Sequence, residues 1–321
     1  MKPRQEPAND ADDARLEALL RERLGDGGLA LERRPADCIS RVYRARLSSG
    51  QALFVKWGFA SAACAAELLR RNPGHPLLPE RGFKDDIRLD DRPVYLFAWR
   101  SVREIPVERM SDAQFEDFVS AWDRLSQTLN EPGMKAYMSR YAAESSKRDP
   151  DVRGPAVDPL DCLDTVRRYA EMHHVAGRLL SPLLSLGPEE LRRRDGAPLQ
   201  VLHGDLHPGN FGFEGDRVAV FFDFDNLAFG YPIEDFARVF AESAKKSGLS
   251  LHPRQKSRLL ARFRDMASAR GTVEEWRFAL NRLRLYYARN SLRRKMSGWR
   301  VAFNVAARDH RLRALLRLLD G

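Results

Sequence analysis

The chain has 321 residues, of which 43% are hydrophobic and 31% are charged, a composition that supports a packed core and argues against global disorder. Its formal net charge is +9, and residues 281–321 carry the whole excess, because they hold eleven Lys or Arg and only two acids. No apolar run reaches the roughly 20 residues of a membrane-spanning helix, and three scattered cysteines argue against a disulfide framework.

The N-terminal segment is polar and acidic and lacks the apolar core of a secretory signal. Together with the sparse cysteines, this predicts a protein of the reducing cytoplasm. We expect residues 1–12 to form a loose tail and residues 13–24 to form an amphipathic helix.

The first hundred residues are rich in predicted strands. The turn signal Ser48-Ser49-Gly50 separates two runs of β-forming residues and indicates a hairpin. Asn72-Pro73-Gly74 ends a helical stretch, and Asp90-Asp91 separates two further strand candidates. The predicted strands are 41–47, 51–57, 82–89 and 93–99, with a helix at 60–71.

The remainder of the chain has mainly helical periodicity. Ser111 is a candidate cap for a helix that begins there, and four prolines within residues 131–160 predict a loop-rich insertion with a short helix. Further helices are expected at 162–184, 188–194, 233–247, 253–269, 273–296 and 305–319, with short strands at 199–202, 211–213 and 218–222.

This order of elements predicts an α+β protein with two lobes. A small antiparallel-sheet lobe comes first and a larger, mostly helical lobe comes second. The boundary falls near residues 95–102, so we assign residues 1–98 to the first lobe and 99–321 to the second. Clefts between lobes are common ligand sites.

Polar groups concentrate in two segments of the second lobe, "HGDLHPGN" (203–210) and "VFFDFDN" (220–226). Pro208 and Gly209 prevent a continuous helix, so the first segment is a loop. We expect Asn210 and Asp223 to face each other across a hairpin, with Asp205 at its mouth. Hard divalent cations prefer oxygen ligands such as these two side chains, which leaves Asp205 to accept a proton from an alcohol.

The two segments resemble the catalytic and metal-binding loops of the aminoglycoside phosphotransferase/choline kinase-like family, whose members have the protein-kinase-like fold. The resemblance covers roughly residues 38–240 and implies a phosphotransferase that uses ATP and Mg²⁺. It assigns roles to six residues: Asp205 as the catalytic base, Asn210 and Asp223 as metal ligands, His203 and Asp235 as structural supports, and Asp225 as an alternative or supporting ligand.

The same resemblance makes residues 1–98 a nucleotide-binding lobe, which needs a Lys for the ATP phosphates and a Glu to anchor it. Lys56 lies inside the apolar strand "LFVKWG". Glu67 is the only acid between Lys56 and Glu80, so we expect these two side chains to pair. Without the downstream motif, an exposed Lys and an exposed helical Glu would be the favoured interpretation.

The remaining nucleotide contacts are less marked in the sequence. No GxGxxG is present, and "DCISRVYRA" (37–45) occupies the place of the phosphate-covering turn, with Ser40 as the expected contact. The adenine is expected at Phe97, Ala98 and Trp99, mainly through backbone hydrogen bonds.

The class of acceptor is predicted from the segment after Asp223. The chain returns to a helix within about ten residues, too few for the long activation segment on which protein kinases dock peptides, and this favours a hydroxyl of a small molecule or glycan. Two opposite signals in the sequence leave the chemical identity of the acceptor undetermined. The first is a group of acids in "DPLDCLD" that suit a polycation or cap a helix, and these are Asp158, Asp161 and Asp164.

The second signal is the basic C-terminus, which suits a phosphate-rich partner, a lipopolysaccharide sugar or an anionic inner membrane face, or else is a solvated helix face. A protein-modifying kinase and a non-catalytic kinase-like scaffold remain alternatives. His203 and His207 invite a zinc interpretation, but Pro208 and Gly209 disrupt the helical spacing of such sites. Aromatic residues among the C-terminal arginines are better explained as core than as nucleic-acid contacts, so no nucleic-acid partner is expected.

Overall fold

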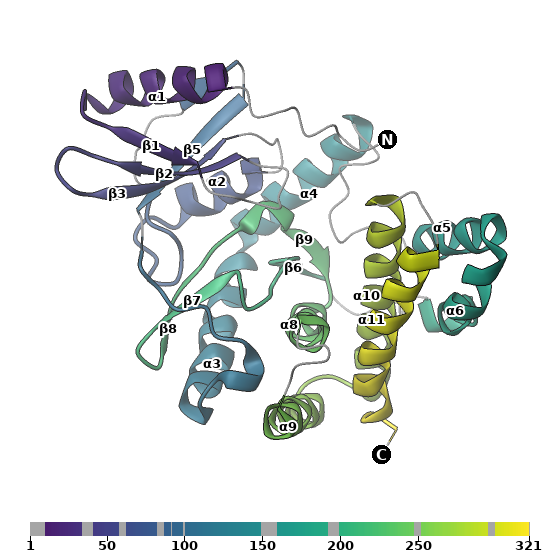
Figure 1. Cartoon of the computed structure of the whole chain (residues 1–321). Coiled ribbons are helices and arrows are strands. Elements are labelled where there is room, and N and C mark those ends of the chain that lie inside the picture. The colour runs from purple at the N-terminus through teal and green to yellow at the C-terminus, as the bar shows by residue number, and fades with distance from the viewer. Residues whose placement is uncertain are drawn as a thin grey trace. The chain divides into compact units, whose positions relative to one another are not determined.

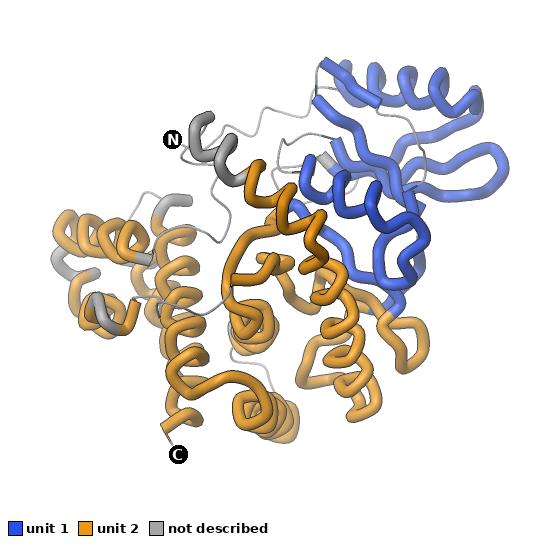
Figure 2. Tube along the Cα trace, turned by 180° about the vertical axis from the view of Figure 1, so that it is seen from behind, with its two compact units in different colours: residues 1–103, 219–225 blue, residues 104–218, 226–321 orange. Residues whose placement is uncertain are grey.

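The structure of the chain is a computed structural model. It describes residues 10–33, 41–57, 62–81, 87–90, 92–98, 100–148, 159–191, 199–246, 252–294 and 299–320. Two compact units are distinguished in Figure 2. Unit 1 comprises residues 1–103 and 219–225, and unit 2 comprises residues 104–218 and 226–321.

Unit 1 is built on a five-stranded antiparallel sheet with the strand order β1-β2-β3-β5-β4 (Figure 1). The predicted hairpin is confirmed: β2 and β3 pair in register from Arg41↔Trp57 to Arg46↔Ala52, and Gly50 in the turn has a φ of +84°. The elements are α1 (Asp10–Leu24), β1 (Ala30–Arg33), β2 (Arg41–Arg46), β3 (Ala52–Trp57), α2 (Ala62–Arg71), β4 (Ile87–Leu89) and β5 (Arg92–Ala98).

The two faces of β3 have different surroundings. Leu53, Val55 and Trp57 are buried, and they share a hydrophobic cluster with Leu16 and Leu20 of α1. Because side chains alternate along a strand, Lys56 belongs to the opposite face, together with Phe54. The hydrophobic pattern of β3 thus keeps a lysine out of the core while fixing its backbone in the centre of the sheet.

Unit 2 is mainly helical and carries short strands. The pairing β6-β9 and the pairing β7-β8 form two small sheets, and β8 contains the point where the chain passes from unit 2 to unit 1. The elements are α3 (Asp112–Leu129), α4 (Pro132–Arg148), α5 (Pro159–Met172), α6 (His174–Leu184), α7 (Pro188–Leu191), β6 (Gln200–Leu202), β7 (Phe211–Glu214), β8 (Arg217–Phe221), β9 (Ala228–Gly230), α8 (Pro232–Lys246), α9 (Pro253–Ala269), α10 (Val273–Arg294) and α11 (Trp299–Arg317).

Local sequence signals explain where two of these helices begin. Ser111 caps α3 in a full capping box with Gln114, as the sequence predicts. The prediction of a loop-rich insertion with a short helix at 131–160 is wrong for residues 132–148, which form the 17-residue helix α4, and residues 149–158 lie outside the described residues. Pro132 is the first residue of α4, where the missing N–H has no helical partner to lose. The helix predicted at 162–184 is two helices, α5 and α6, separated at His173.

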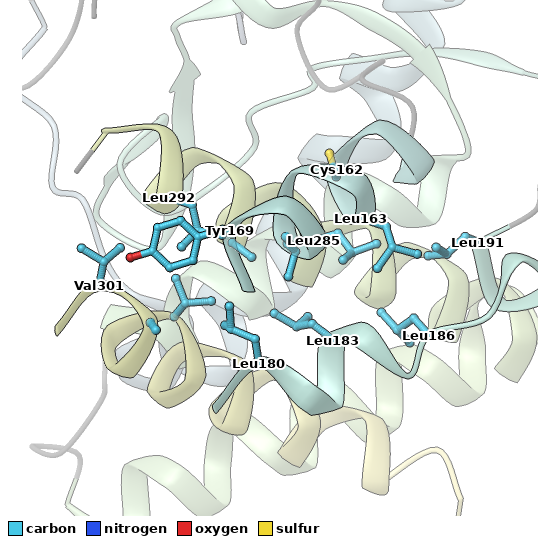
Figure 3. Close-up of a cluster of buried hydrophobic side chains, with 14 residues drawn as sticks. Cys162, Leu163, Tyr169, Leu180, Leu183, Leu186, Leu191, Leu285, Leu292 and Val301 are labelled. Carbon is cyan, nitrogen blue, oxygen red and sulfur yellow. The ribbon is translucent and has the colours of Figure 1, made fainter. Parts of the chain in front are cut away.

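Side chains from α5, α6, α10 and α11 of unit 2 share one hydrophobic cluster (Figure 3). Side chains of α5, α6, α10 and α11 point toward one another there, and Leu285 of α10 is fully buried. Within the described residues, no helix is long and apolar enough to cross a membrane.

Several arginines of the basic C-terminus are used inside this unit. Arg284 donates to both carboxylate oxygens of the buried Asp309, at 2.6 and 3.3 Å, and Arg313 lies 3.1 Å from the same carboxylate. Arg282 pairs with Glu234 at 2.7 Å. Part of the positive charge that the sequence concentrates here is therefore neutralised by acids of the same unit.

Candidate active site

The loop 203–210 is anchored by the first turns of α8. The Asp235 carboxylate, which is 1% exposed, accepts hydrogen bonds from the backbone N–H of His203 at 2.9 Å and of Gly204 at 3.0 Å. Gly204 has a φ of +75°, a conformation that glycine adopts without steric cost. Asp235 thus supports the backbone directly before Asp205.

The second half of the loop is closed by Asn210. Its backbone N–H donates to the His207 carbonyl at 2.8 Å, and its side-chain Nδ2 donates to the Asp205 carbonyl at 2.8 Å. A Cβ at Gly209 would come within 2.9 Å of the His207 ring, so glycine is needed at this close approach. The loop presents the Asp205 carboxylate partly exposed, while the amide nitrogen of Asn210 is directed inward.

A residue that the sequence analysis missed contacts this carboxylate. Arg238 of α8 donates from Nη1 to the Gly204 carbonyl at 2.8 Å, and its Nε lies 3.1 Å from Asp205 Oδ1. The signal for it was present in "EDFAR", because Asp235 and Arg238 are three residues apart and therefore share one face of a helix. Only the burial of that face shows where the arginine points.

A second group of charges lies in unit 1. Lys56 Nζ is 2.7 Å from Asp223 Oδ1 and 2.5 Å from Asp225 Oδ2. Burial lowers the pKa of the Lys56 ammonium, but the two carboxylates raise it by more, so the pKa stands above its ordinary value. Asp223 has a φ of +65°, which is uncommon for a residue with a side chain and is typical of functional sites.

The predicted pair between Lys56 and Glu67 is not formed in the structure. The Glu67 carboxylate instead accepts hydrogen bonds from Arg70 Nε at 2.7 Å and Arg71 Nε at 2.6 Å. These arginines lie three and four residues further along α2, where a helix brings side chains together regardless of the tertiary fold. Local partners therefore hold Glu67, and the partners of Lys56 come from the DFD segment.

The predicted adenine contacts are only partly described. Ser40 and Trp99 lie outside the described residues. Phe97 is partly buried in β5, and the Ala98 N–H donates to the Glu80 carbonyl at 2.9 Å, which commits this donor within unit 1.

The acids considered for a polycation site have local explanations where the structure describes them. Asp158 is outside the described residues, Asp161 lies in the first turn of α5, and Asp164 is 3.3 Å from Arg167 one turn further on. Asp161 is thus a helix-start acid, one of the two interpretations of this group, whereas Asp164 lies further along α5 and pairs locally with Arg167.

Solved structures with the same fold define a class of proteins. The aminoglycoside phosphotransferase APH(4)-Ia is 14% identical, and the alignment covers 95% of this chain and 99% of that chain with a TM-score of 0.57. The amicoumacin kinase hAmiN is 14% identical over 95% and 96% with a TM-score of 0.54. The macrolide 2′-phosphotransferase MphH from Brachybacterium faecium is 16% identical over 93% and 97% with a TM-score of 0.53. The predicted protein-kinase-like α+β fold is therefore confirmed.

The sequence itself gives the family. The model of the phosphotransferase enzyme family matches residues 31–277, so the chain belongs to this family and is a kinase that acts on hydroxyl groups. No curated protein sequence matches the chain significantly. The family resemblance inferred from "HGDLHPGN" and "VFFDFDN" is confirmed by this match.

The raised pKa of Asp235 makes stability depend on pH in one direction. Burial raises this pKa to about 7 from the ordinary 3.8, against the backbone N–H donors and Arg238, which lower it. Between about pH 4 and pH 7, the folded state therefore retains a proton that the unfolded state has released. The contribution of this proton to the free energy of unfolding is complete below about pH 4 and is lost as the pH rises through 7.

Between about pH 5 and pH 7, we expect the free energy of unfolding of the wild type to fall by about 2 kcal/mol relative to that of Asp235→Asn. Urea unfolding of both proteins across this range measures the difference. A difference that is flat, or that grows with pH, would contradict the assignment.

The partners of Lys56 and Glu67 predict that neutralising Asp225 lowers the free energy of unfolding more than neutralising Glu67 does. Asp225→Asn removes a carboxylate from the largely buried Lys56 and should destabilise the protein by about 1.5 to 3 kcal/mol. Glu67→Gln removes the partner of arginines that are more exposed and should cost less than about 1 kcal/mol. Urea unfolding measures both, and equal or reversed costs would indicate that Glu67 supports Lys56 in solution.

Proposed function

We propose that this protein transfers the γ-phosphoryl group of ATP to a hydroxyl of a small molecule or glycan with the help of Mg²⁺. The observation that carries the proposal is the loop 203–210, in which Asp235 fixes the backbone while Asp205 stays partly exposed. In-line phosphoryl transfer requires positioning and charge neutralisation more than covalent chemistry by the enzyme. A rigid loop with an accessible carboxylate suits that requirement.

Asp205 is the proposed general base. Its carboxylate would accept a hydrogen bond from the acceptor hydroxyl, direct the oxygen toward the phosphorus, and take the proton as the new bond forms. The hydrogen bond from Asn210 Nδ2 to the Asp205 carbonyl limits rotation of the loop at this residue. The catalytic group therefore has a fixed backbone, a condition for the advantage gained from orientation.

The residues proposed to hold the metal fit a hard cation in their chemistry. The amide nitrogen of Asn210 is committed to the Asp205 carbonyl, which leaves the amide oxygen as its ligand atom. The Asp223 carboxylate is 40% exposed and supplies the anionic oxygen. Mg²⁺ is typically bound by one or two such protein oxygens together with substrate phosphates. When bound, the ion would neutralise the charge of the phosphates and of the transferring group.

Lys56 is the proposed contact for the ATP phosphates. It is presented from the central strand β3, and its two carboxylate partners keep it protonated. Solved relatives support the choice of cofactor: one structure of hAmiN is a complex with AMP-PNP and Ca²⁺, and one structure of a thermostable mutant of APH(4)-Ia is a complex with ADP and hygromycin B. Ser40, Phe97, Ala98 and Trp99 remain the proposed surroundings of the nucleotide.

A small hydroxyl compound or glycan is the proposed acceptor. Pro232, the first residue of α8, comes only nine positions after Asp223, and β9 occupies part of that interval. This leaves no room for a long peptide-docking segment. The relatives named above act on amicoumacin, aminoglycosides and macrolides according to their names. A coupled assay of ADP release over aminoglycosides, macrolides, amino alcohols and sugars would identify the class.

The role of Asp205 is tested by Asp205→Asn. We expect this variant to lose about 10³-fold in the rate of phosphoryl transfer, because the carboxylate that orients and deprotonates the hydroxyl is gone. Binding of AMP-PNP, measured by calorimetry, should change less than about twofold. The control is Asp216→Asn, an exposed acid in the turn between β7 and β8. A transfer rate near that of the wild type in Asp205→Asn would refute the base assignment.

A further inference from the structure

One face of α8 carries three ionisable side chains, all of them buried. Asp235 is 1% exposed, Arg238 is 4% exposed and Glu242 is 6% exposed. Their spacing of three and four residues places them on the same face of the helix. Buried charges are strongly destabilising unless they are paired and hydrogen-bonded. The arrangement of these charges therefore has to be explained by the groups that they contact.

Two of these side chains bind the same short piece of backbone with opposite polarity. Asp235 accepts hydrogen bonds from the N–H groups of His203 and Gly204, and Arg238 donates to the Gly204 carbonyl at 2.8 Å. One turn of α8 thus binds two backbone N–H groups and one backbone carbonyl of the segment directly before Asp205.

Arg238 also reaches the side chain of Asp205. Its Nε lies 3.1 Å from Asp205 Oδ1, and the guanidinium side is buried while the Asp205 side chain is 29% exposed. The carboxylate is therefore held from the interior by a cation and still reaches the surroundings. The Nε contact is an ion pair without hydrogen-bond geometry, whereas Nη1 makes a hydrogen bond to the Gly204 carbonyl. A planar guanidinium can make both contacts at once, which the compact ammonium of lysine cannot.

The guanidinium of Arg238 has its own fixed environment. Its central carbon lies 5.0 Å from the centroid of the Tyr286 ring of α10. Burial alone would lower the pKa of Arg238, but Tyr287, Asp205, Tyr286 and Glu242 together raise it above the ordinary value. The side chain is therefore a permanent and immobile positive charge beside Asp205.

We propose that Arg238 is a positioning residue for phosphoryl transfer, which holds the Asp205 carboxylate in the orientation that meets the acceptor hydroxyl. The inference rests on the proposed function, because it requires Asp205 to be the general base. Because Arg238 is 4% exposed and contacts the Asp205 carboxylate, it is placed to act through Asp205 and not by direct contact with a ligand. Its removal should therefore lower the rate of the chemical step and leave nucleotide affinity unchanged.

The chain offers a matched control in Arg262 of α9. This residue is 5% exposed, donates to the Val107 carbonyl at 2.6 Å, pairs with Asp112 at 2.6 Å and lies 4.9 Å from the Phe115 ring centroid. It thus has the same kind of burial, carbonyl, carboxylate and aromatic partner as Arg238, but away from the loop 203–210. Arg262→Lys therefore measures how much replacing a buried arginine by lysine lowers the rate constant for structural reasons alone.

The experiment measures hydrolysis of MgATP in single turnover, with water as the acceptor, at saturating enzyme. We expect Arg238→Lys to lower the rate constant by about 10- to 50-fold, because the orientation of a catalytic group strongly affects the rate. The dissociation constant for AMP-PNP should stay within about twofold of the wild type, and Arg262→Lys should change the rate by less than about twofold. Arg238→Gln keeps a donor for the Gly204 carbonyl without the charge and should lose more than Arg238→Lys.

A double-mutant cycle separates positioning from a general loss of structure. If Arg238 acts through Asp205, then Arg238→Lys should have no further effect in the Asp205→Asn background. The same 10- to 50-fold loss in both backgrounds would show a purely structural role and overturn the inference. A wild-type rate in both Arg238→Lys and Arg238→Gln would also overturn the inference about Arg238. In that case, an inactive Asp205→Asn would still support the proposed function. A wild-type rate in Asp205→Asn would instead refute the proposed function itself.

Discussion

The hydrogen bonds between the Asp235 carboxylate and the backbone of His203 and Gly204 are the interactions on which the candidate site depends. The loop that they hold contains glycine and proline, so it gains little order from its own backbone. A carboxylate buried to this degree would be destabilising by itself. It is accommodated because it accepts from two backbone donors that would otherwise be buried without partners. The helix and the loop therefore stabilise each other.

Buried ionisable side chains are also paired with opposite charges elsewhere in the described structure. In unit 1, Lys56 lies on the side of β3 that does not face the core and is compensated by Asp223 and Asp225. In unit 2, Arg284 and Asp309 form a buried pair between α10 and α11. Such pairs contribute modestly to stability, and breaking one leaves an uncompensated charge. They fix where charged groups stand, which is a requirement of a site for phosphoryl transfer.

Those parts of the fold that depend on local chemistry could be predicted from the sequence. Gly50 indicated the hairpin of β2 and β3, Ser111 indicated the start of α3, and the two polar segments indicated the family. The length of α4 is not predictable from the prolines of 131–160, because Pro132 stands in the first turn, where a proline leaves the helix intact.

The contacts that could not be predicted are those of charged side chains for which the sequence offers more than one interaction partner. Arg70 and Arg71 stand beside Glu67 in the sequence, but the family pattern pairs Glu67 with the distant Lys56, and the local arginines are its partners in the structure. The contact of Arg238 is not predictable from the sequence, because its spacing from Asp235 becomes informative only once that face of α8 is known to be buried. Net charge was also a poor guide at the C-terminus, since several of the arginines there meet acids of unit 2.

A crystal structure of the protein with AMP-PNP and Mg²⁺ tests the central claim most directly. We predict a Mg²⁺ ion bound by the amide oxygen of Asn210 and a carboxylate oxygen of Asp223, at about 2.0 to 2.1 Å. We also predict that Lys56 Nζ lies within hydrogen-bond distance of the nucleotide phosphates. A nucleotide bound elsewhere, or a metal ion that neither Asn210 nor Asp223 ligates, would contradict the proposed site.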